Sequence, residues 1–301
     1  MAKRLAYNVI NRERLTNAGH YLAKRLREYP APVITAYELN KIITKMYAAK
    51  HDQPLYLRKT ASEEDRYARH RDNLRDANII RSDEDYSRAH FILSASDLPA
   101  EEIACIVDPL CCVAFMSAMQ RWGLTNRSPK SLLLMKPSRG RAKEAIQAQM
   151  EEDGMDETSL PLTNVSHPHY VRGRHVSVTE TNESYEAIKL RGSNVRITTI
   201  GQTFLDTLRF PEQCGGMQHV ISVWENTIED YLETVIDTIN RTAKPIVLMR
   251  AGYILDEILD LEHAVVEKWS RMAQRGGSRK LDPHKPFKST YSEKWMISLN
   301  A

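Results

Sequence analysis

The segment Thr203–Gly216, with the sequence TFLDTLRFPEQCGG, constrains the fold more tightly than any other part of the chain. Threonine is a common helix cap, and apolar side chains follow it at one-turn spacing. Asp206 and Arg209 lie one turn apart, which favours an ion pair. Pro211 ends this helix, and the pair Gly215–Gly216 permits a sharp reversal before the next one. The segment therefore predicts two short helices joined by a tight turn, which alone implies no function.

The size and composition of the chain place it among globular proteins. With 301 residues it has room for two domains, and 27% charged residues is an ordinary fraction. No apolar run approaches the ~20 residues of a membrane span, and the first residues lack the apolar core of a secretory signal. We therefore expect a cytoplasmic protein, associated with the nucleoid when bound to DNA, with no membrane partner. The four cysteines have no paired spacing, so we expect small buried side chains: Cys105, Cys111, Cys112 and Cys214.

The N-terminal part is basic and has a pattern of three helices. Residues 1–60 carry twelve Lys and Arg against four Asp and Glu, an excess of eight positive charges that suggests a polyanionic partner. Helices are predicted over 11–28, after Thr35 and after Ser62, the last two with an acidic residue at the capping-box position. A polar turn between two β-prone stretches follows in 79–93. This order predicts a winged helix-turn-helix over residues 1–94.

The third helix of this unit is the expected reading element. We predict that its outward face enters the major groove, that basic residues before it approach the DNA, and that the hairpin contacts phosphates. A solvated basic face or a protein-interaction module is the alternative, and the acidic side chains of the third helix favour it. The predicted DNA contacts are Arg66, Arg69, His70 and Asn73 on the helix, Tyr56, Arg58 and Lys59 before it, and Arg81 and Arg88 in the hairpin.

The remaining residues, 95–301, predict a second, mixed domain. We expect a buried helix over 108–122, strands within 131–199, helices within 203–274 and a basic tail over 275–301. Predicted strands include the stretch 160–165. The fold class is therefore α+β, with a winged helix followed by a mixed domain that has a helical C-terminal part.

Signals for catalysis are weak. The chain has no phosphate-binding glycine loop, no GxSxG and no HExxH. His167, His169 and His175 form the best metal candidate, but no acidic or cysteine partner lies near them in sequence. A nucleophilic Cys111 or Cys214 lacks an activating neighbour. Four carboxylates could form an acid/base or metal cluster: Asp206, Glu212, Asp256 and Glu257. Ion pairing of these carboxylates with Arg209 and Arg250 along the helices is the simpler interpretation. We expect no catalytic residue, no cofactor and no metal.

Four phrases in a fixed order resemble the AbiEi family of antitoxins. They are Asp108-Pro-Leu followed by residues 119–129, MQRWGLTNRSP; the segment Thr203–Gly216; Arg250-Ala-Gly-Tyr-Ile-Leu; and Lys280-Leu-Asp-Pro followed by residues 295–300. The resemblance implies a winged helix joined to an antitoxin domain, in a type IV toxin–antitoxin pair associated with phage defence by abortive infection.

This resemblance also implies a role. The protein would repress its own operon by binding repeated or inverted-repeat operator DNA, and would counteract a nucleotidyltransferase toxin without a stable complex. The toxin-related residues would be Asp206, Arg209, Arg250 and Tyr253. The alternatives are a solitary regulator or an interaction module without a toxin, and an enzyme acting on the toxin or its products.

Overall fold

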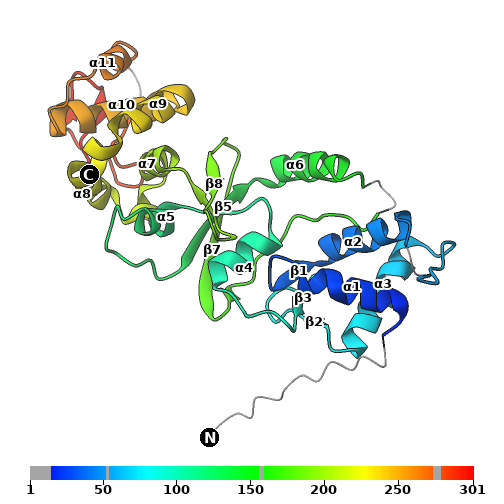
Figure 1. Cartoon of the computed structure of the whole chain (residues 1–301). Helices are drawn as coiled ribbons and strands as arrows, with labels where there is room; N and C mark the ends of the chain where they lie inside the picture. The colour runs from blue at the N-terminus through cyan, green and yellow to red at the C-terminus, as the bar shows by residue number, and fades with distance from the viewer. Residues whose placement is uncertain (1–14, 52–53, 156–158, 274–278) are drawn as a thin grey trace, which may run out of the picture. The chain divides into compact units, whose positions relative to one another are not determined.

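The computed structural model describes residues 15–51, 54–155, 159–273 and 279–301. The chain divides into two compact units, each assembled from two stretches of sequence. Unit 1 comprises residues 1–111 and 137–176, and unit 2 comprises 112–136 and 177–301. The boundary expected after residue 94 is therefore not where the units divide. Helices and strands are mixed in both units, so the expected α+β class is confirmed (Figure 1).

The first half of unit 1 is built from three helices and a small sheet (Figure 1). Capping by threonine and serine starts each helix, as Thr35 and Ser62 illustrate: their hydroxyls accept the N–H groups of Glu38 and Asp65, each at 3.1 Å. The strands form an antiparallel sheet in the order β1-β3-β2, and the 79–93 hairpin is confirmed. The elements are α1 (Asn17–Arg27), β1 (Val33–Thr35), α2 (Ala36–Ala48), α3 (Glu63–Asp76), β2 (Ile80–Ser82) and β3 (Ala89–Ile92).

The rest of unit 1 follows in two stretches. Helix α4 (Ala100–Val107) ends the first, and helix α6 (Arg139–Glu152) begins the second. Strand β6 (Tyr170–Val171) then forms a tight hairpin with the start of β7 (Arg174–Thr181), and β7 continues into unit 2. Apolar side chains of the helices and sheet form one buried core, to which Leu22, Ile43 and Leu74 contribute.

Unit 2 combines a sheet with a helical region. Its strands follow the order β7-β5-β4-β9-β8, with β4 and β9 parallel and the pairs β4–β5 and β8–β9 antiparallel. One buried core contains three of the four tryptophans, among them Trp224. The bounds are β4 (Cys112–Val113), α5 (Phe115–Arg121), β5 (Leu132–Pro137), β8 (Ala187–Lys189), β9 (Arg196–Thr198), α7 (Ile200–Arg209), α8 (Met217–Thr227), α9 (Leu232–Thr242), α10 (Pro245–Gly252), α11 (Ala264–Ser270), β10 (Tyr291–Ser292) and β11 (Ile297–Ser298).

Two expectations for the mixed region are wrong. The helix predicted over 108–122 is a turn, the strand β4 and the shorter helix α5, because a short apolar run fits a central strand as well as a helix. The strand predicted over 160–165 is extended chain outside any sheet. Within the described residues, no helix is long and apolar enough to cross a bilayer.

Helix α7 begins earlier than predicted. Its cap is Thr199, whose hydroxyl accepts the N–H of Gln202 at 3.2 Å, while Thr203 lies inside the helix and is buried. The predicted stop at Pro211 is confirmed. Gly215 and Gly216 have φ values of 90° and 86°, a region that glycine enters without steric cost, and α8 starts directly after them.

Candidate functional site

Three of the four predicted contacts on α3 point inward. His70 is only 6% exposed, and its Nε2 lies 3.2 Å from the Tyr47 hydroxyl. Asn73 accepts a hydrogen bond at 3.3 Å from Thr16, the cap of α1. The Arg66 guanidinium lies over the Tyr47 ring. The expectation that these residues share an outward face is wrong, because residues 66, 70 and 73 form one strip that packs against the other two helices.

Burial also changes the charge of this strip. Desolvation, followed by the nearby positive charge of Arg69, lowers the pKa of His70 to about 4. The imidazole is therefore neutral at pH 7 and carries no charge for a phosphate. Arg69 is the one predicted contact on α3 that is exposed, and the exposed strip around it carries Asp65, Asp72 and Asp76.

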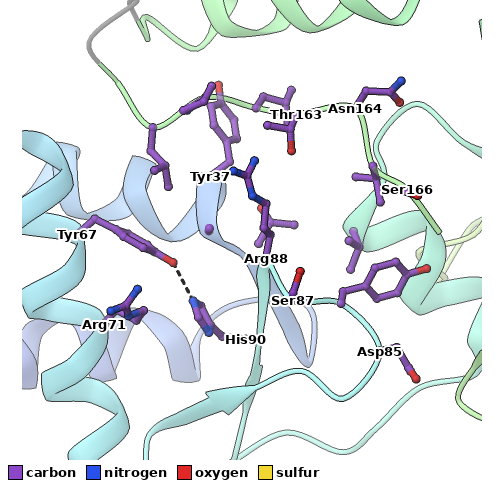
Figure 2. A pocket seen from close by; sticks show the side chains of 18 of the residues that line it. Tyr37, Tyr67, Arg71, Asp85, Ser87, Arg88, His90, Thr163, Asn164 and Ser166 are labelled. Atoms are coloured by element: carbon purple, nitrogen blue, oxygen red, sulfur yellow. Dashed lines mark hydrogen bonds between the residues drawn. The ribbon is translucent and has the colours of Figure 1, made fainter. Parts of the chain in front are cut away.

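A second face of α3 borders a cavity of unit 1, which we call the arginine cavity. Its volume is about 850 Å³. Arg71 and Arg75 reach it from α3, and Arg88 from the end of the β2–β3 loop. The opposite wall is the extended segment 160–168, with Thr163, Asn164 and Ser166 in view (Figure 2). Other lining side chains are Thr35, Tyr37, Glu64, Tyr67, Asp85, Ser87 and His90.

The floor of the cavity holds a buried pair, Tyr67 and His90. The tyrosine hydroxyl lies 2.8 Å from His90 Nε2 (Figure 2). Burial, and then the positive charges of Arg75 and Arg71, lower the pKa of His90 to about 4. The floor is therefore uncharged at neutral pH, and the charge of the cavity comes from its walls.

The walls carry more positive than negative charge. Of the two carboxylates that line the cavity, Asp85 already forms an ion pair with Arg172, so Glu64 is the remaining acidic group. Arg75 donates to the Ser82 hydroxyl, and Arg71 to Asp72 at 2.9 Å. Arg88 is exposed. Arg71 is therefore partly neutralised by Asp72, and the positive charge that the cavity offers to an anionic group comes mainly from Arg75 and Arg88.

The other predicted DNA residues are mostly on the surface. Tyr56 is 82% exposed and has a positive φ of 51°, and Arg58 and Lys59 beside it are exposed. Arg81 is half-buried, pairs with Glu84 at 2.7 Å and lies over the Phe91 ring. Arg81 is therefore partly neutralised within the hairpin.

The four toxin-related candidates lie within unit 2. Arg250 is buried and donates from Nη1 to the Leu208 carbonyl at 2.8 Å and from Nε to the Lys280 carbonyl at 3.0 Å. It thereby joins α7, α10 and the C-terminal segment. Desolvation lowers its pKa to about 10. Tyr253 is half-buried at the end of α10.

The predicted ion pair within α7 is wrong. Arg209 pairs instead with Glu183 at 3.0 Å, and Asp206 accepts a hydrogen bond from Gln202 Nε2 at 2.7 Å. Asp206 is 1% exposed, and its Oδ2 has no hydrogen-bond partner among the described residues. Burial raises the pKa of Asp206 to about 7, against the opposing effects of Gln202 and Arg209.

The metal and nucleophile candidates are rearranged. His169 and His175 stack on the β6–β7 hairpin, whereas His167 is drawn away from them toward Asp108 and Cys111. All four cysteines are buried, as expected, and none forms a disulfide with another described cysteine. Two of the carboxylates considered for a cluster have separate partners: Asp256 accepts a hydrogen bond from the Trp295 indole N–H, and Glu257 accepts one from the Ser292 hydroxyl.

Sequence reasoning missed Arg71 and Arg75 as site residues. Their four-residue spacing on α3 is a signal for a shared face, but Tyr67 on the same side resembles a core residue. The second wall of the cavity comes from residues almost ninety positions later in the chain, which no local pattern connects to α3.

Comparisons with known proteins give little beyond these observations. No protein-family model matches the chain, and no curated protein matches it. Among solved structures, the crystal structure of the RV2827C protein from Mycobacterium tuberculosis is similar, with 11% sequence identity, 98% of this chain and 95% of that chain covered, and a TM-score of 0.49.

Proposed function

We propose that this chain is the antitoxin of an AbiE-like type IV toxin–antitoxin pair and that it represses its own operon by binding DNA through unit 1. The resemblance of its four sequence phrases to the AbiEi family supports the antitoxin role. The element order of unit 1 and the charge around α3 support the DNA-binding role. Each role has its own test.

The observation that carries the DNA-binding proposal is the arrangement of α1, β1, α2, α3, β2 and β3. Three helices, a strand after the first, and a closing hairpin on an antiparallel sheet are the parts of a winged helix. In such a unit α2 and α3 form the helix-turn-helix pair, and the β2–β3 hairpin is the wing.

The distribution of charge selects one side of α3 for the DNA. The fully exposed strip contains three aspartates and one arginine, which repels phosphates. The side that carries Arg71 and Arg75 lies next to Arg88 of the hairpin, at the arginine cavity. We therefore assign phosphate contacts to these three arginines, together with the exposed Arg58 and Lys59, in place of Arg66, His70 and Asn73.

This assignment is tested by the salt dependence of binding. The probe is a labelled duplex that covers the promoter region of the chain's own operon, titrated by fluorescence anisotropy at several salt concentrations. We expect Arg71→Ala and Arg88→Ala each to weaken binding and to reduce the slope of log K against log salt by about one. Arg271→Ala, an exposed arginine of unit 2, is the matched control and leaves binding unchanged.

Two outcomes would contradict the assignment. Unchanged affinity and slope in both cavity variants would exclude these arginines as phosphate contacts. An equal loss in Arg271→Ala would show that binding depends on total charge. If neither the native chain nor any variant binds the duplex in a salt-sensitive manner, the DNA-binding proposal itself fails.

The antitoxin role is tested separately in cells. The native chain is co-expressed with the nucleotidyltransferase-like protein encoded beside it, and growth is measured. We expect rescue by the native chain and equally by the double variant R71A/R88A, which no longer represses a promoter fusion. Loss of rescue in this double variant, with its fold intact by circular dichroism, would show that neutralisation requires DNA binding. Absence of rescue by the native chain would leave a regulator without a toxin.

A further inference from the structure

Three residues with different ligand atoms meet inside unit 1. The Asp108 carboxylate, the Cys111 thiol and the His167 imidazole bring atoms within 4.8 Å of one another. Within the described ranges they are the one group of three or more such side chains with this spacing. The cluster lies next to the arginine cavity, because His167 also lines the cavity wall.

The backbone presents the first two ligands together. Asp108 follows the last turn of α4, and the Cys111 N–H donates to the Asp108 carbonyl at 3.4 Å across a turn. Ligand pairs two to four residues apart on a turn are typical of zinc sites. Asp108 Oδ1 accepts the Leu110 N–H at 2.9 Å, which holds the carboxylate so that Oδ2 faces His167.

The imidazole is oriented from both sides. Its Nε2 lies 3.0 Å from Asp108 Oδ2, and its Nδ1 lies 2.8 Å from the Tyr86 hydroxyl. Metal-binding histidines use one nitrogen for the metal while a second partner holds the other. Tyr86 is that second partner and holds Nδ1, so that Nε2 faces the Asp108 carboxylate and the Cys111 thiol. Neighbouring ligand atoms of a tetrahedral zinc are roughly 3–4 Å apart, so the oxygen and nitrogen already have ligand spacing.

Burial and charge favour a divalent cation. The side chains of Asp108 and His167 are each 1% exposed, and Cys111 is fully buried. A thiolate, a carboxylate and a neutral imidazole around a divalent ion give a net charge of zero, which a buried site requires. Sulfur and nitrogen ligands select zinc over magnesium or calcium.

The same geometry argues against a nucleophilic Cys111. Its thiol donates to the Ala104 carbonyl at 3.5 Å and has no exposed surface, so a substrate carbon has no approach to the sulfur. A thiol of this kind is a buried donor that becomes a ligand when it loses its proton.

We propose that Asp108, Cys111 and His167 bind a zinc ion, with a water in the fourth position. Zinc binding breaks the hydrogen bond between His167 and Asp108, moves the imidazole proton to Nδ1, where the Tyr86 oxygen accepts a hydrogen bond from it, and releases the thiol proton to solvent. It ties the segment 160–168, one wall of the arginine cavity, to the end of α4. This inference departs from the expectation of no metal and does not depend on the proposed DNA-binding or antitoxin role.

The test measures metal content in the full chain. Purified protein is stripped with a chelator, incubated with zinc sulfate, desalted and analysed by inductively coupled plasma mass spectrometry. We expect one zinc per chain in the native protein, in Cys105→Ala and in His169→Gln, and at least tenfold less retained zinc in Cys111→Ala and His167→Gln. Cys105 is the matched control because it is a buried cysteine of α4, just before the cluster.

Cobalt gives a second readout that does not require a folded cysteine variant. Cobalt added to the stripped native chain is expected to give a thiolate charge-transfer absorption band, which zinc then displaces. Chelator is expected to lower the melting temperature of the native chain but not that of His167→Gln. No retained zinc and no cobalt band in the native chain would overturn the proposal, as would zinc binding in Cys111→Ala equal to that in Cys105→Ala.

Discussion

Asp206 makes the stability of unit 2 depend on pH in an unusual direction. The perturbation is Asp206→Asn, which keeps the shape of the side chain and removes its titration. In the folded chain burial raises the pKa of this carboxyl from 3.8 to about 7. A raised pKa means that the folded state holds the proton more tightly than the unfolded chain does. The contribution to stability is therefore complete below pH 4 and is lost as the pH rises through 7.

The size of the effect follows from the shift. A change of about three pKa units corresponds to about 4 kcal/mol in the free energy of unfolding, lost at up to about 1.4 kcal/mol per pH unit. Between pH 5 and pH 7 the native chain should lose about 2 kcal/mol that the Asp206→Asn variant does not lose. The exposed α9 carboxylate offers a control, Asp237→Asn, which should retain the native pH dependence.

The assay uses the placement of tryptophan. Trp122, Trp224, Trp269 and Trp295 all belong to unit 2, so tryptophan fluorescence during urea unfolding follows that unit alone. Unfolding free energies are measured at intervals of one pH unit from 5 to 8. The reasoning is refuted if the native chain and Asp206→Asn have parallel stability curves across this range.

Three further predictions concern packing and charge. Unit 1 should lose stability as the pH falls from 6.5 to 4, because burial lowers the pKa of His70 and His90 to about 4 each. Circular dichroism measures the acid unfolding of the native chain and of H70Q/H90Q. Equal acid sensitivity of the two proteins would contradict the prediction. Gly252→Ala should destabilise unit 2 by about 1–3 kcal/mol, because the added carbon would lie 2.1 Å from the Trp295 ring. Gly140→Ala adds a carbon in open space and should be neutral or slightly stabilising. Equal urea midpoints of Gly252→Ala and the native chain would count against the close packing. Arg172→Ala should cost unit 1 about 3 kcal/mol, because it leaves the buried Asp83 without its cation; a loss below about 1 kcal/mol in thermal unfolding would show that solvent replaces the pair.

Features encoded within a few residues were predictable from the sequence. The caps at Thr35 and Ser62 and the glycine reversal at Gly215–Gly216 depend on neighbouring atoms, and the structure confirms them. The apolar run at Cys111–Phe115 was not predictable, because burial of a central strand removes the alternation that distinguishes strands from helices. The cap of α7 was misassigned since two threonines four residues apart fit the same pattern, and only tertiary packing distinguishes Thr199 from Thr203.

The candidate site was less predictable than the fold. On α3 almost every side chain is polar, so hydrophobic periodicity could not separate the buried strip of His70 and Asn73 from the cavity side of Arg71. The partnership of His167 with Asp108 joins residues 59 positions apart. Sequence spacing instead suggested His169 and His175 as its partners, because proximity along the chain is the one measure a single sequence offers.

The interleaving of the two units constrains synthesis as well as structure. The chain passes from one unit to the other after residues 111, 136 and 176, so unit 1 lacks α6 and the wall of its cavity until residue 176 has left the ribosome. A nascent chain of 111 residues holds a three-helix core whose closing segment does not yet exist. A fusion that replaces the chain after residue 94 by another protein would separate α1–α3 from residues that they pack with. Exchange of a whole unit requires cutting and rejoining the chain at several positions.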